Sequence, residues 1–376
     1  VALLTVNDRP EFSLQPDDTE VCEGDNAFFT IATGATTDPV IQWQEWDGSS
    51  WSDAAYAGSN STTLTVPGVT SGMDGNSYRA YLEGYCTPYI YSDSAILTVW
   101  EEPEITGQSN DTAVCEGEPA VFTVNAWPTT NPSYQWYVYK PSVGSWELAD
   151  DAEFSGANTA TLIVNPTNSG MDGWQFRAEV TGECPGMATS AAVTLTIYEQ
   201  PEITTQPVSD TVCEDGIAVF TVDATPTTSP VYYWEVNDGG FWFAASGVNY
   251  AGQGTNTLTV SNVTSEMSGN QIRVTITGTC TPEERSDAVS LIVNEKPENL
   301  DDPDDQQICE DGSTFFTVDA GMTTNPQYRW EYYDGSSWNA ATNAPFSGED
   351  TDILTLTNVP STFDGSEIRA IISGEC

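Results

Sequence analysis

The sequence contains no histidine, and only 9 lysines and arginines stand against 56 aspartates and glutamates. Without histidine the chain can form neither a Ser-His-Asp nor a Cys-His catalytic centre, and most zinc sites are excluded as well. The formal net charge of −47 repels nucleic acids and anionic lipids, whose protein partners hold phosphates through lysine and arginine. The composition therefore predicts a protein that is not an enzyme and does not bind nucleic acid.

Long apolar runs and helical periodicity are also missing. No segment reaches the roughly 18–20 apolar residues that cross a bilayer, and no window repeats with the period of an amphipathic helix. No signal peptide is visible, but residues 1–7 already have the pattern of a strand, so we expect a stretch of a longer protein. Salt and divalent cations weaken the repulsion between acidic surfaces, so we expect this protein to occur in a salty or Ca²⁺-containing medium.

What the sequence does contain is a unit repeated four times. Each copy opens on V/I-C-E, a tryptophan follows 21 residues after the cysteine, and a Thr/Leu-rich segment and an element such as M-D-G-N-S-Y-R-A come next. Each copy closes on G-x-C. The opening cysteines are Cys22, Cys115, Cys213 and Cys309, the tryptophans are Trp43, Trp136, Trp234 and Trp330, and the closing cysteines are Cys86, Cys184, Cys280 and Cys376.

Each unit consists of short alternating strands between clusters of Gly, Pro, Asn and Asp, and 12 Trp, 16 Tyr and 13 Phe supply packed cores. The linkers are almost absent and carry a proline, which stiffens a joint. We predict an all-β tandem array of sandwiches. Residues 1–9 form the last strand of a preceding or neighbouring copy, and the repeats span 10–100, 101–199, 200–295 and 296–376, the last without its own final strand.

The tryptophan, the Thr/Leu-rich strand and the motif Asp74-Gly75-x-x-Tyr78 resemble those of immunoglobulin-like domains. Trp43 resembles the buried strand-C tryptophan, and Tyr78 resembles the tyrosine of the corner before strand F. The whole order of motifs is similar to repeats in giant secreted surface adhesins of Bacteroidetes. That resemblance implies an extracellular location, at a cell surface or secreted, and immunoglobulin-like β-sandwich repeats.

The chain departs from the antibody pattern at the core disulfide. Aligned on Trp43, the two cysteine positions fall near Ile31 and Ala80, which are apolar. The opening cysteine instead ends the strand before the A–B turn, and the closing cysteine ends strand F, at the opposite pole. A strand of about seven residues separates the poles by more than ~20 Å, too far for a disulfide.

Head-to-tail packing would instead bring the opening cysteine of one repeat to the closing cysteine of the next. This geometry favours the pairs Cys22–Cys184, Cys115–Cys280 and Cys213–Cys376. Cys86 and Cys309 would then pair with cysteines of repeats beyond this stretch of the protein. Pairing within a repeat, as of Cys22 with Cys86, and free thiols stay open as alternatives.

Other positions give weaker signals. The acidic residues Asp301, Asp302, Asp304 and Asp305 could hold Ca²⁺, although a solvated acidic face explains them as well. Ser94, Thr112 and Thr211 lie in D-[ST]-small motifs similar to the O-glycosylation motif of Bacteroidetes. Arg79, Arg177, Arg273 and Arg369 hold one outward position on strand F and suggest cross-strand pairs. A second tryptophan series, at 51, 146, 242 and 338, suggests packing over the sandwich edge, with sugar stacking as the alternative.

The sequence thus favours a structural stalk or filament of an adhesin-like protein that needs no cofactor except the Ca²⁺ considered above. Its partners would be further repeats or identical subunits, and surface glycans or host proteins would be met by other regions. One alternative is that each repeat is a glycan- or protein-binding module. Another is a donor-strand-linked polymer, in which Val1–Asn7 of one chain completes repeat 4 of another.

Overall fold

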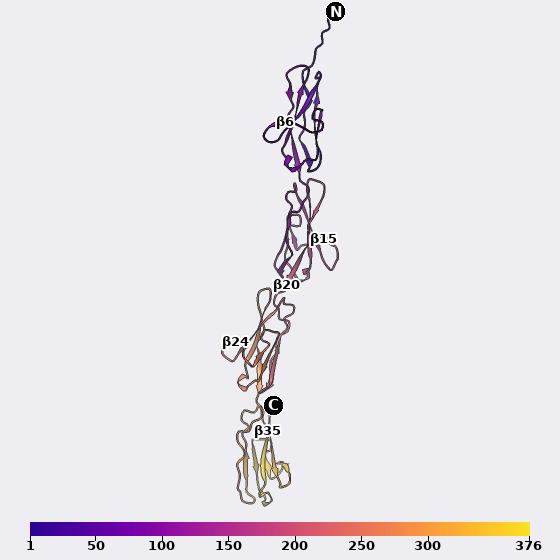
Figure 1. The fold of residues 1–376 in the computed structure, drawn as a ribbon. Coiled ribbons are helices and arrows are strands. Elements are labelled where there is room, and N and C mark those ends of the chain that lie inside the picture. Colours follow the sequence, from indigo (N-terminus) through magenta and orange to yellow (C-terminus); the bar gives the residue numbers. More distant parts are fainter. The chain divides into compact units, whose positions relative to one another are not determined.

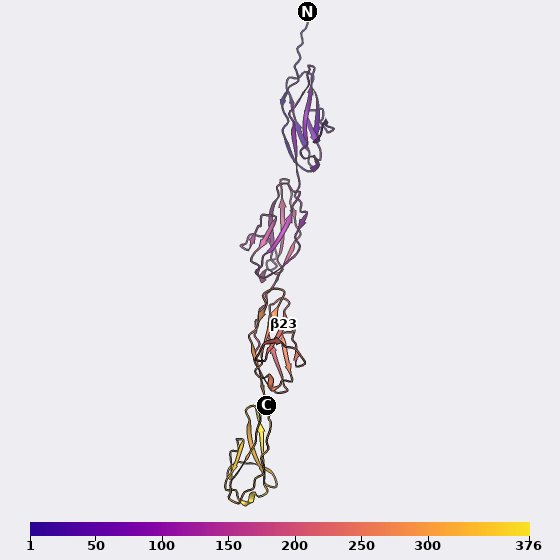
Figure 2. The ribbon, with the colours of Figure 1, turned by 90° about the vertical axis from the view of Figure 1, so that its left-hand side faces the viewer.

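The computed structural model describes all residues from Val1 to Cys376, and it consists of β-strands and turns (Figures 1 and 2). Its only helical elements are four single turns of 3-10 helix, so the all-β prediction is confirmed. The chain divides into two compact units, Val1–Ile197 and Tyr198–Cys376. Each unit contains two sequence repeats, and each repeat has its own hydrophobic core, while the bounds drawn between repeats stay a prediction.

The strands of the first unit follow the repeats closely. Repeat 1 contains β1 (Phe12–Leu14), β2 (Thr19–Cys22), β3 (Ala27–Thr30), β4 (Ala32–Thr33), β5 (Val40–Trp46), β6 (Trp51–Asp53), β7 (Thr63–Val66), η1 (Ser71–Met73), β8 (Ser77–Glu83), β9 (Ile90–Tyr91) and β10 (Ala95–Trp100). Repeat 2 contains β11 (Gly107–Gln108), β12 (Thr112–Cys115), β13 (Ala120–Asn125), β14 (Ser133–Tyr139), β15 (Trp146–Leu148), β16 (Phe154–Ser155), β17 (Thr161–Val164), η2 (Ser169–Met171), β18 (Gln175–Thr181), β19 (Ala188–Thr189) and β20 (Val193–Tyr198).

The second unit repeats this order. Repeat 3 contains β21 (Asp210–Cys213), β22 (Ile217–Thr221), β23 (Val231–Asn237), β24 (Trp242–Ala244), β25 (Tyr250–Ala251), β26 (Thr257–Ser261), η3 (Ser265–Met267), β27 (Gln271–Thr277), β28 (Glu284–Arg285) and β29 (Val289–Asn294). Repeat 4 contains β30 (Thr314–Thr317), β31 (Gln327–Tyr333), β32 (Trp338–Ala340), β33 (Phe346–Ser347), β34 (Ile353–Leu356), η4 (Ser361–Phe363) and β35 (Glu367–Ser373).

Two sheets enclose each core. In repeat 1 the larger sheet has the order β2-β10-β8-β5-β6, and β9 also pairs with β8. Strand β10 runs parallel to β2, which places Trp100 opposite Cys22, and antiparallel to β8. The smaller sheet contributes β3 and β7, whose Phe29 and Leu64 pack against Trp43. Repeats 2 and 3 have the same strand order in the larger sheet.

Alternation of side chains along each strand builds this core. On β8 the residues Tyr78, Ala80 and Leu82 point inward and are fully buried, while their neighbours lie outward. The core tryptophans Trp43, Trp136, Trp234 and Trp330 are at most 1% exposed. Each indole N–H donates to a backbone carbonyl, at 2.8 Å from Trp43 to Ser61, so none of the four core indoles leaves its N–H unpaired.

The D-G motif before strand F anchors the last strand of the repeat. In repeat 1 the N–H of Val99 donates to the Asp74 carboxylate at 2.9 Å, and the N–H of Gly75 donates to Leu97 O. Gly75 has φ +82°, a conformation that glycine adopts without strain. Repeat 2 has the same contact between Ile197 and Asp172, and in repeat 3 a serine hydroxyl replaces the carboxylate.

Repeat 4 differs because it lacks this last strand. Its β35 pairs with β31 alone, and no strand forms before its A–B turn, where β2, β12 and β21 lie in the other repeats. The strand before the turn thus depends on the parallel ladder with the final strand.

Candidate functional site at the cysteine-bridged joints

The first unit contains a disulfide between two repeats. Cys22 at the end of β2 is bonded to Cys184, which lies in the turn after β18, with their Cα atoms 5.7 Å apart. Both residues are almost fully buried. The backbone around the bridge is paired as well: the N–H of Glu23 donates to Trp100 O at 2.9 Å, and Cys184 Sγ lies 3.4 Å from the same oxygen.

The second unit contains the equivalent bridge, between Cys213 of repeat 3 and Cys376 of repeat 4, with a Cα separation of 5.8 Å. Cys115 and Cys280 are disulfide-bonded too, and their pairing with each other stays a prediction. Cys86 and Cys309 are free thiols. The two described bridges each join an opening cysteine to the closing cysteine of the following repeat, and neither lies inside a sandwich core.

A pair of threonines holds the linker at each joint. In repeat 2 the linker N–H groups of Glu101 and Glu104 donate to the hydroxyls of Thr130 and Thr129, at 2.8 and 2.9 Å. The same two contacts recur in the other repeats, from Asp8 and Glu11 to Thr37 and Thr36, from Glu199 and Glu202 to Thr228 and Thr227, and from Glu295 and Glu298 to Thr324 and Thr323. The T-T pair of the B–C loop therefore fixes the chain that enters its own repeat.

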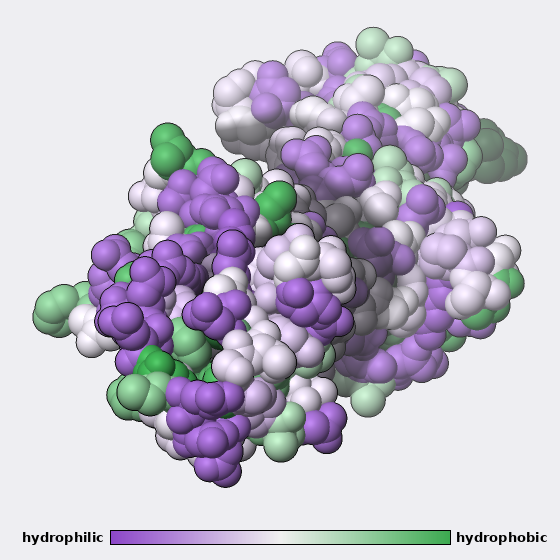
Figure 3. Space-filling view, turned by 90° about the horizontal axis from the view of Figure 1, so that it is seen from below, coloured by the Kyte–Doolittle hydropathy of each residue, from purple (hydrophilic) through white to green (hydrophobic).

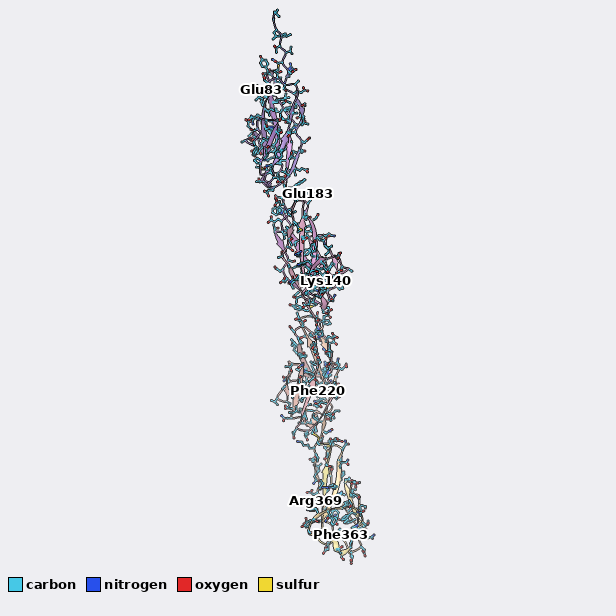
Figure 4. All side chains as sticks on the ribbon, turned by 90° about the vertical axis from the view of Figure 1, so that its right-hand side faces the viewer. Glu83, Lys140, Glu183, Phe220, Phe363 and Arg369 are labelled. Carbon is cyan, nitrogen blue, oxygen red and sulfur yellow. A yellow bond between two sulfur atoms is a disulfide. The ribbon has the colours of Figure 1, made fainter.

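The glycine of the G-x-C motif is needed because this loop packs directly on it. A Cβ atom on Gly182 would lie 2.7 Å from Thr129 Cγ2 and 2.8 Å from Thr130 O. The next residue, Glu183, donates its N–H to Thr130 O at 3.1 Å, and Figure 4 labels it at the joint. Loop, linker and closing cysteine are thus held in one hydrogen-bonded cluster.

Two carboxylates face each other beside the first bridge. The N–H of Ser71 donates to Glu23 at 3.0 Å and holds the pKa of that carboxyl below its usual value. Partial burial, followed by the nearby Glu23, raises the pKa of Glu101. The corresponding joint in the second unit carries an ion pair instead, between Lys296 Nζ and Asp215 Oδ2 at 2.7 Å. The polar environment of the joints therefore varies, while the bridge and the threonine pair recur.

Apolar side chains fill the place of the usual core disulfide: Ile31 and Ala80 are buried to 1% and 0% exposure. At the corner, the hydroxyl of Tyr78 donates to the carboxylate of Glu45 at 2.7 Å. Burial, followed by the Glu45 carboxylate, raises the pKa of Tyr78 far above its usual value. The corner thus ties strand F to strand C through a charged acceptor.

The strand-F arginines each stack on the second tryptophan of their repeat. The guanidinium carbons of Arg79, Arg177, Arg273 and Arg369 lie 4.1, 4.5, 3.9 and 4.0 Å from the ring centroids of Trp51, Trp146, Trp242 and Trp338. The expected cross-strand ion pairs are present in repeats 3 and 4, to Glu235 and Glu331. The second tryptophans thus cover the sandwich edge as the aromatic half of a cation–π pair.

The acidic residues considered for Ca²⁺ do not form a metal site in the structure. No group of three or more His, Cys, Asp or Glu is placed to hold a metal ion, and Asp301, Asp302, Asp304 and Asp305 are all exposed. Ser94 and Thr211 are exposed, and Thr112 is half-buried in β12. Most of the face seen in Figure 3 is hydrophilic, with small separate hydrophobic patches. None of the short helical turns has the length or the apolarity to cross a bilayer.

Comparison with known proteins supports the fold. No family model matches the chain. It is 26% identical to Roundabout homolog 1 of Mus musculus over 247 residues, 62% of this chain and 15% of that protein. It is 30% identical to Endoglucanase C of Cellulomonas fimi over 186 residues, 49% of this chain and 16% of that protein. The chain therefore spans about a sixth of either relative.

Among solved structures, the titin I-band fragment I67–I69 matches with a TM-score of 0.50 at 18% identity, over 77% of this chain and all of the fragment. A variant of the same fragment is described as three immunoglobulin domains. At this identity the likeness concerns the fold alone, and it establishes the chain as a tandem array of immunoglobulin-like β-sandwich domains.

Proposed function

We propose that the chain is a structural repeat region, a stalk or filament, of an extracellular adhesin-like protein at a cell surface. One observation carries the proposal: each described disulfide joins consecutive repeats, Cys22 to Cys184 and Cys213 to Cys376. A bridge across a joint limits bending between two domains and passes tension from one to the next. Disulfides persist outside the reducing cytosol, which supports the extracellular location.

The threonine pair supports the same function. It fixes the linker by two hydrogen bonds at every joint, so the repeats are not connected by a free chain. In the same proposal Cys115 pairs with Cys280, and Cys86 and Cys309 pair with repeats beyond this stretch. O-glycans on Ser94, Thr112 and Thr211 would coat the array and protect it from proteases.

Small-angle X-ray scattering tests the proposal by comparing the oxidised chain with the C22S/C184S variant. Loss of the bridge is expected to broaden the distribution of interatomic distances and to lower the radius of gyration, because the joint can then bend. The control is C86S/C309S, which removes two thiols and leaves the bridges intact. Identical scattering from all three proteins would show that the bridge does not stiffen the joint and would remove the basis of the proposal.

A second function, recognition of glycan or protein by single repeats, has one observation in its favour. The rings of Tyr81, Tyr89 and Tyr91 lie 4.9–5.8 Å apart on the β8–β9 hairpin, and Tyr89 and Tyr91 are exposed. The equivalent strand pairs in repeats 2 and 3 carry no such cluster. A glycan array probed with the chain and with Y89A/Y91A tests it, and binding that only the unmodified chain shows would support this role.

A further inference from the structure

Repeat 3 has a hollow of about 380 Å³ on the outer face of its larger sheet. It lies over β23 and β24, the strands that Figures 2 and 1 label. The volume falls within the range of about 300–1,000 Å³ that is usual for small-molecule sites. Side chains of β23, β24, β27 and β28, and of the turn before β28, line it: Tyr233, Glu235, Ala244, Thr275, Glu283 and Arg285.

A glutamine closes the equivalent place in repeats 1 and 2. Gln42 and Gln135 stand where repeat 3 has Tyr233, one residue before the core tryptophan. Each glutamine amide donates to the backbone carbonyl of that tryptophan, at 2.8 Å in repeat 1 and 2.9 Å in repeat 2. In repeat 1 the amide of Asn60 also donates to Gln42 Oε1 at 2.8 Å. Tyr233 presents a ring instead and is 57% exposed, so the place stays open.

Small residues hold the other sides of the hollow open. Gly254 stands where repeat 1 has Asn60, and a Cβ atom added to this glycine would meet nothing within 4 Å. Ala244 stands where repeat 1 has Asp53 and repeat 2 has Leu148, each at the same register position of the C–C′ strand pair. The hollow of repeat 3 therefore results from particular residues of this repeat.

A backbone donor lies at the edge of the hollow. In repeat 1 the N–H of Trp43 donates to Ser59 O in the loop before β7 at 2.7 Å, and repeat 2 has the same bond. No backbone carbonyl accepts the equivalent N–H of Trp234. Trp234 and the matching loop residue, Gln253, both line the hollow. A ligand oxygen in the hollow would therefore find a free backbone donor.

The charges around the hollow balance. Arg273 Nε donates to Glu235 at 2.8 Å, and Arg285 Nη2 donates to Glu283 at 3.3 Å. Arg285 Nε also donates to the hydroxyl of Thr275 at 3.1 Å. Two guanidinium groups thus offset two carboxylates, in a chain whose formal net charge is −47. The site attracts no cation, and the charge of the whole chain repels anions, so a neutral polar ligand fits best.

We propose that this hollow binds a neutral hexopyranose, either free or as one unit of a glycan. The C–H face of the sugar ring stacks on Tyr233, and its hydroxyls bond to the Glu and Arg side chains and to the Trp234 N–H. A carboxylate accepts from two neighbouring hydroxyls and a guanidinium donates to two, so both suit the diols of a sugar. The proposal deepens the second function given above and rests on it, since it names a ligand class and a site on repeat 3.

A glycan array with neutral and sialylated glycans, probed with the whole chain, tests the proposal. Neutral glycans are expected to bind, and the dissociation constant of each bound glycan is then measured by NMR titration. The variant Y233Q introduces the glutamine of repeats 1 and 2, and A244L introduces the leucine of repeat 2, so repeat 3 should fold with either. Each variant closes the hollow and should raise the dissociation constant at least tenfold.

The matched control is A288L, which enlarges an exposed alanine that does not line the hollow. Its dissociation constant should stay within twofold of that of the unmodified chain, and the thermal melts of all three variants should superimpose. An equal loss of binding in A288L would overturn the proposal, because the effect would then not come from the hollow.

Two other results would also overturn it. Binding that Y89A/Y91A removes and Y233Q leaves unchanged would place recognition at the tyrosine cluster of repeat 1, so the second function would stand without this site. An array on which no neutral glycan binds would remove both the site and the second function. The stalk proposal depends on the disulfides and is unaffected by either result.

Discussion

The bridges predict how far the chain can be stretched. When the chain is pulled at its two ends, tension follows the shortest covalent path. That path runs from Val1 to Cys22, across the bridge to Cys184, then to Cys213 and across the second bridge to Cys376. The residues enclosed by the two bridges carry no tension while the disulfides are intact, even if their domains unfold.

The magnitude follows from counting residues. The path contains 21 residue steps before the first bridge and 29 between the bridges, whereas the reduced chain offers 375. At about 3.6 Å per extended residue, the oxidised chain should reach about 190 Å, including the two bridges, and the reduced chain about 1,350 Å. The variant C22S/C184S should reach about 650 Å if Cys115 is bonded to Cys280 and about 760 Å if it is not.

Optical tweezers with handles at both ends measure these lengths directly, first in the absence and then in the presence of a reductant. The expected record shows a short final extension for the oxidised chain and the full length after reduction. An oxidised chain that releases four complete domains and approaches 1,350 Å would refute the reasoning, because no bridge would then cross the joints.

Three further predictions follow from other contacts. Gly182→Ala should destabilise repeat 2 by about 1–3 kcal/mol in guanidinium unfolding, because its Cβ collides with the threonine loop, whereas Gly72→Ala should be neutral because it meets nothing closer than 3.8 Å. Tyr78→Phe should destabilise repeat 1 by about 1–2 kcal/mol in the same assay, since it removes the hydrogen bond to Glu45; an unchanged midpoint would show that the hydroxyl contributes nothing. Added NaCl or Ca²⁺ should raise the Tm of the whole chain by screening its formal charge of −47, and a Tm that ignores both would count against this electrostatic argument.

Strand positions could be predicted from the sequence because the signal is local. The alternation around Trp43 and along 77–83, and the turn residues between strands, mark β5 and β8 within a residue or two. The short strand β9 was missed, since two residues such as Ile90 and Tyr91 carry no periodicity. The same limit applies to β19 and β28.

The contacts at the joints were harder to foresee, because they link segments far apart in sequence. The T-T pair could be noted as a recurrent motif, but its bonds to Glu101 and Glu104 depend on where the linker runs. The tryptophan–arginine stacks require the registers of both β6 and β8 against β5, the strand between them, which no local pattern reveals. The hydrogen bond from the Tyr78 hydroxyl to Glu45 could not be predicted either, because it also joins two strands that lie far apart in the sequence.

The central claim is that disulfides cross the joints between repeats, and a peptide map of the oxidised, unreduced chain tests it most directly. Proteolysis under conditions that prevent disulfide exchange, followed by mass spectrometry, should yield one linked peptide with Cys22 and Cys184 and another with Cys213 and Cys376. A linked peptide with Cys22 and Cys86 would contradict the claim, because it would place the bridge inside a single repeat.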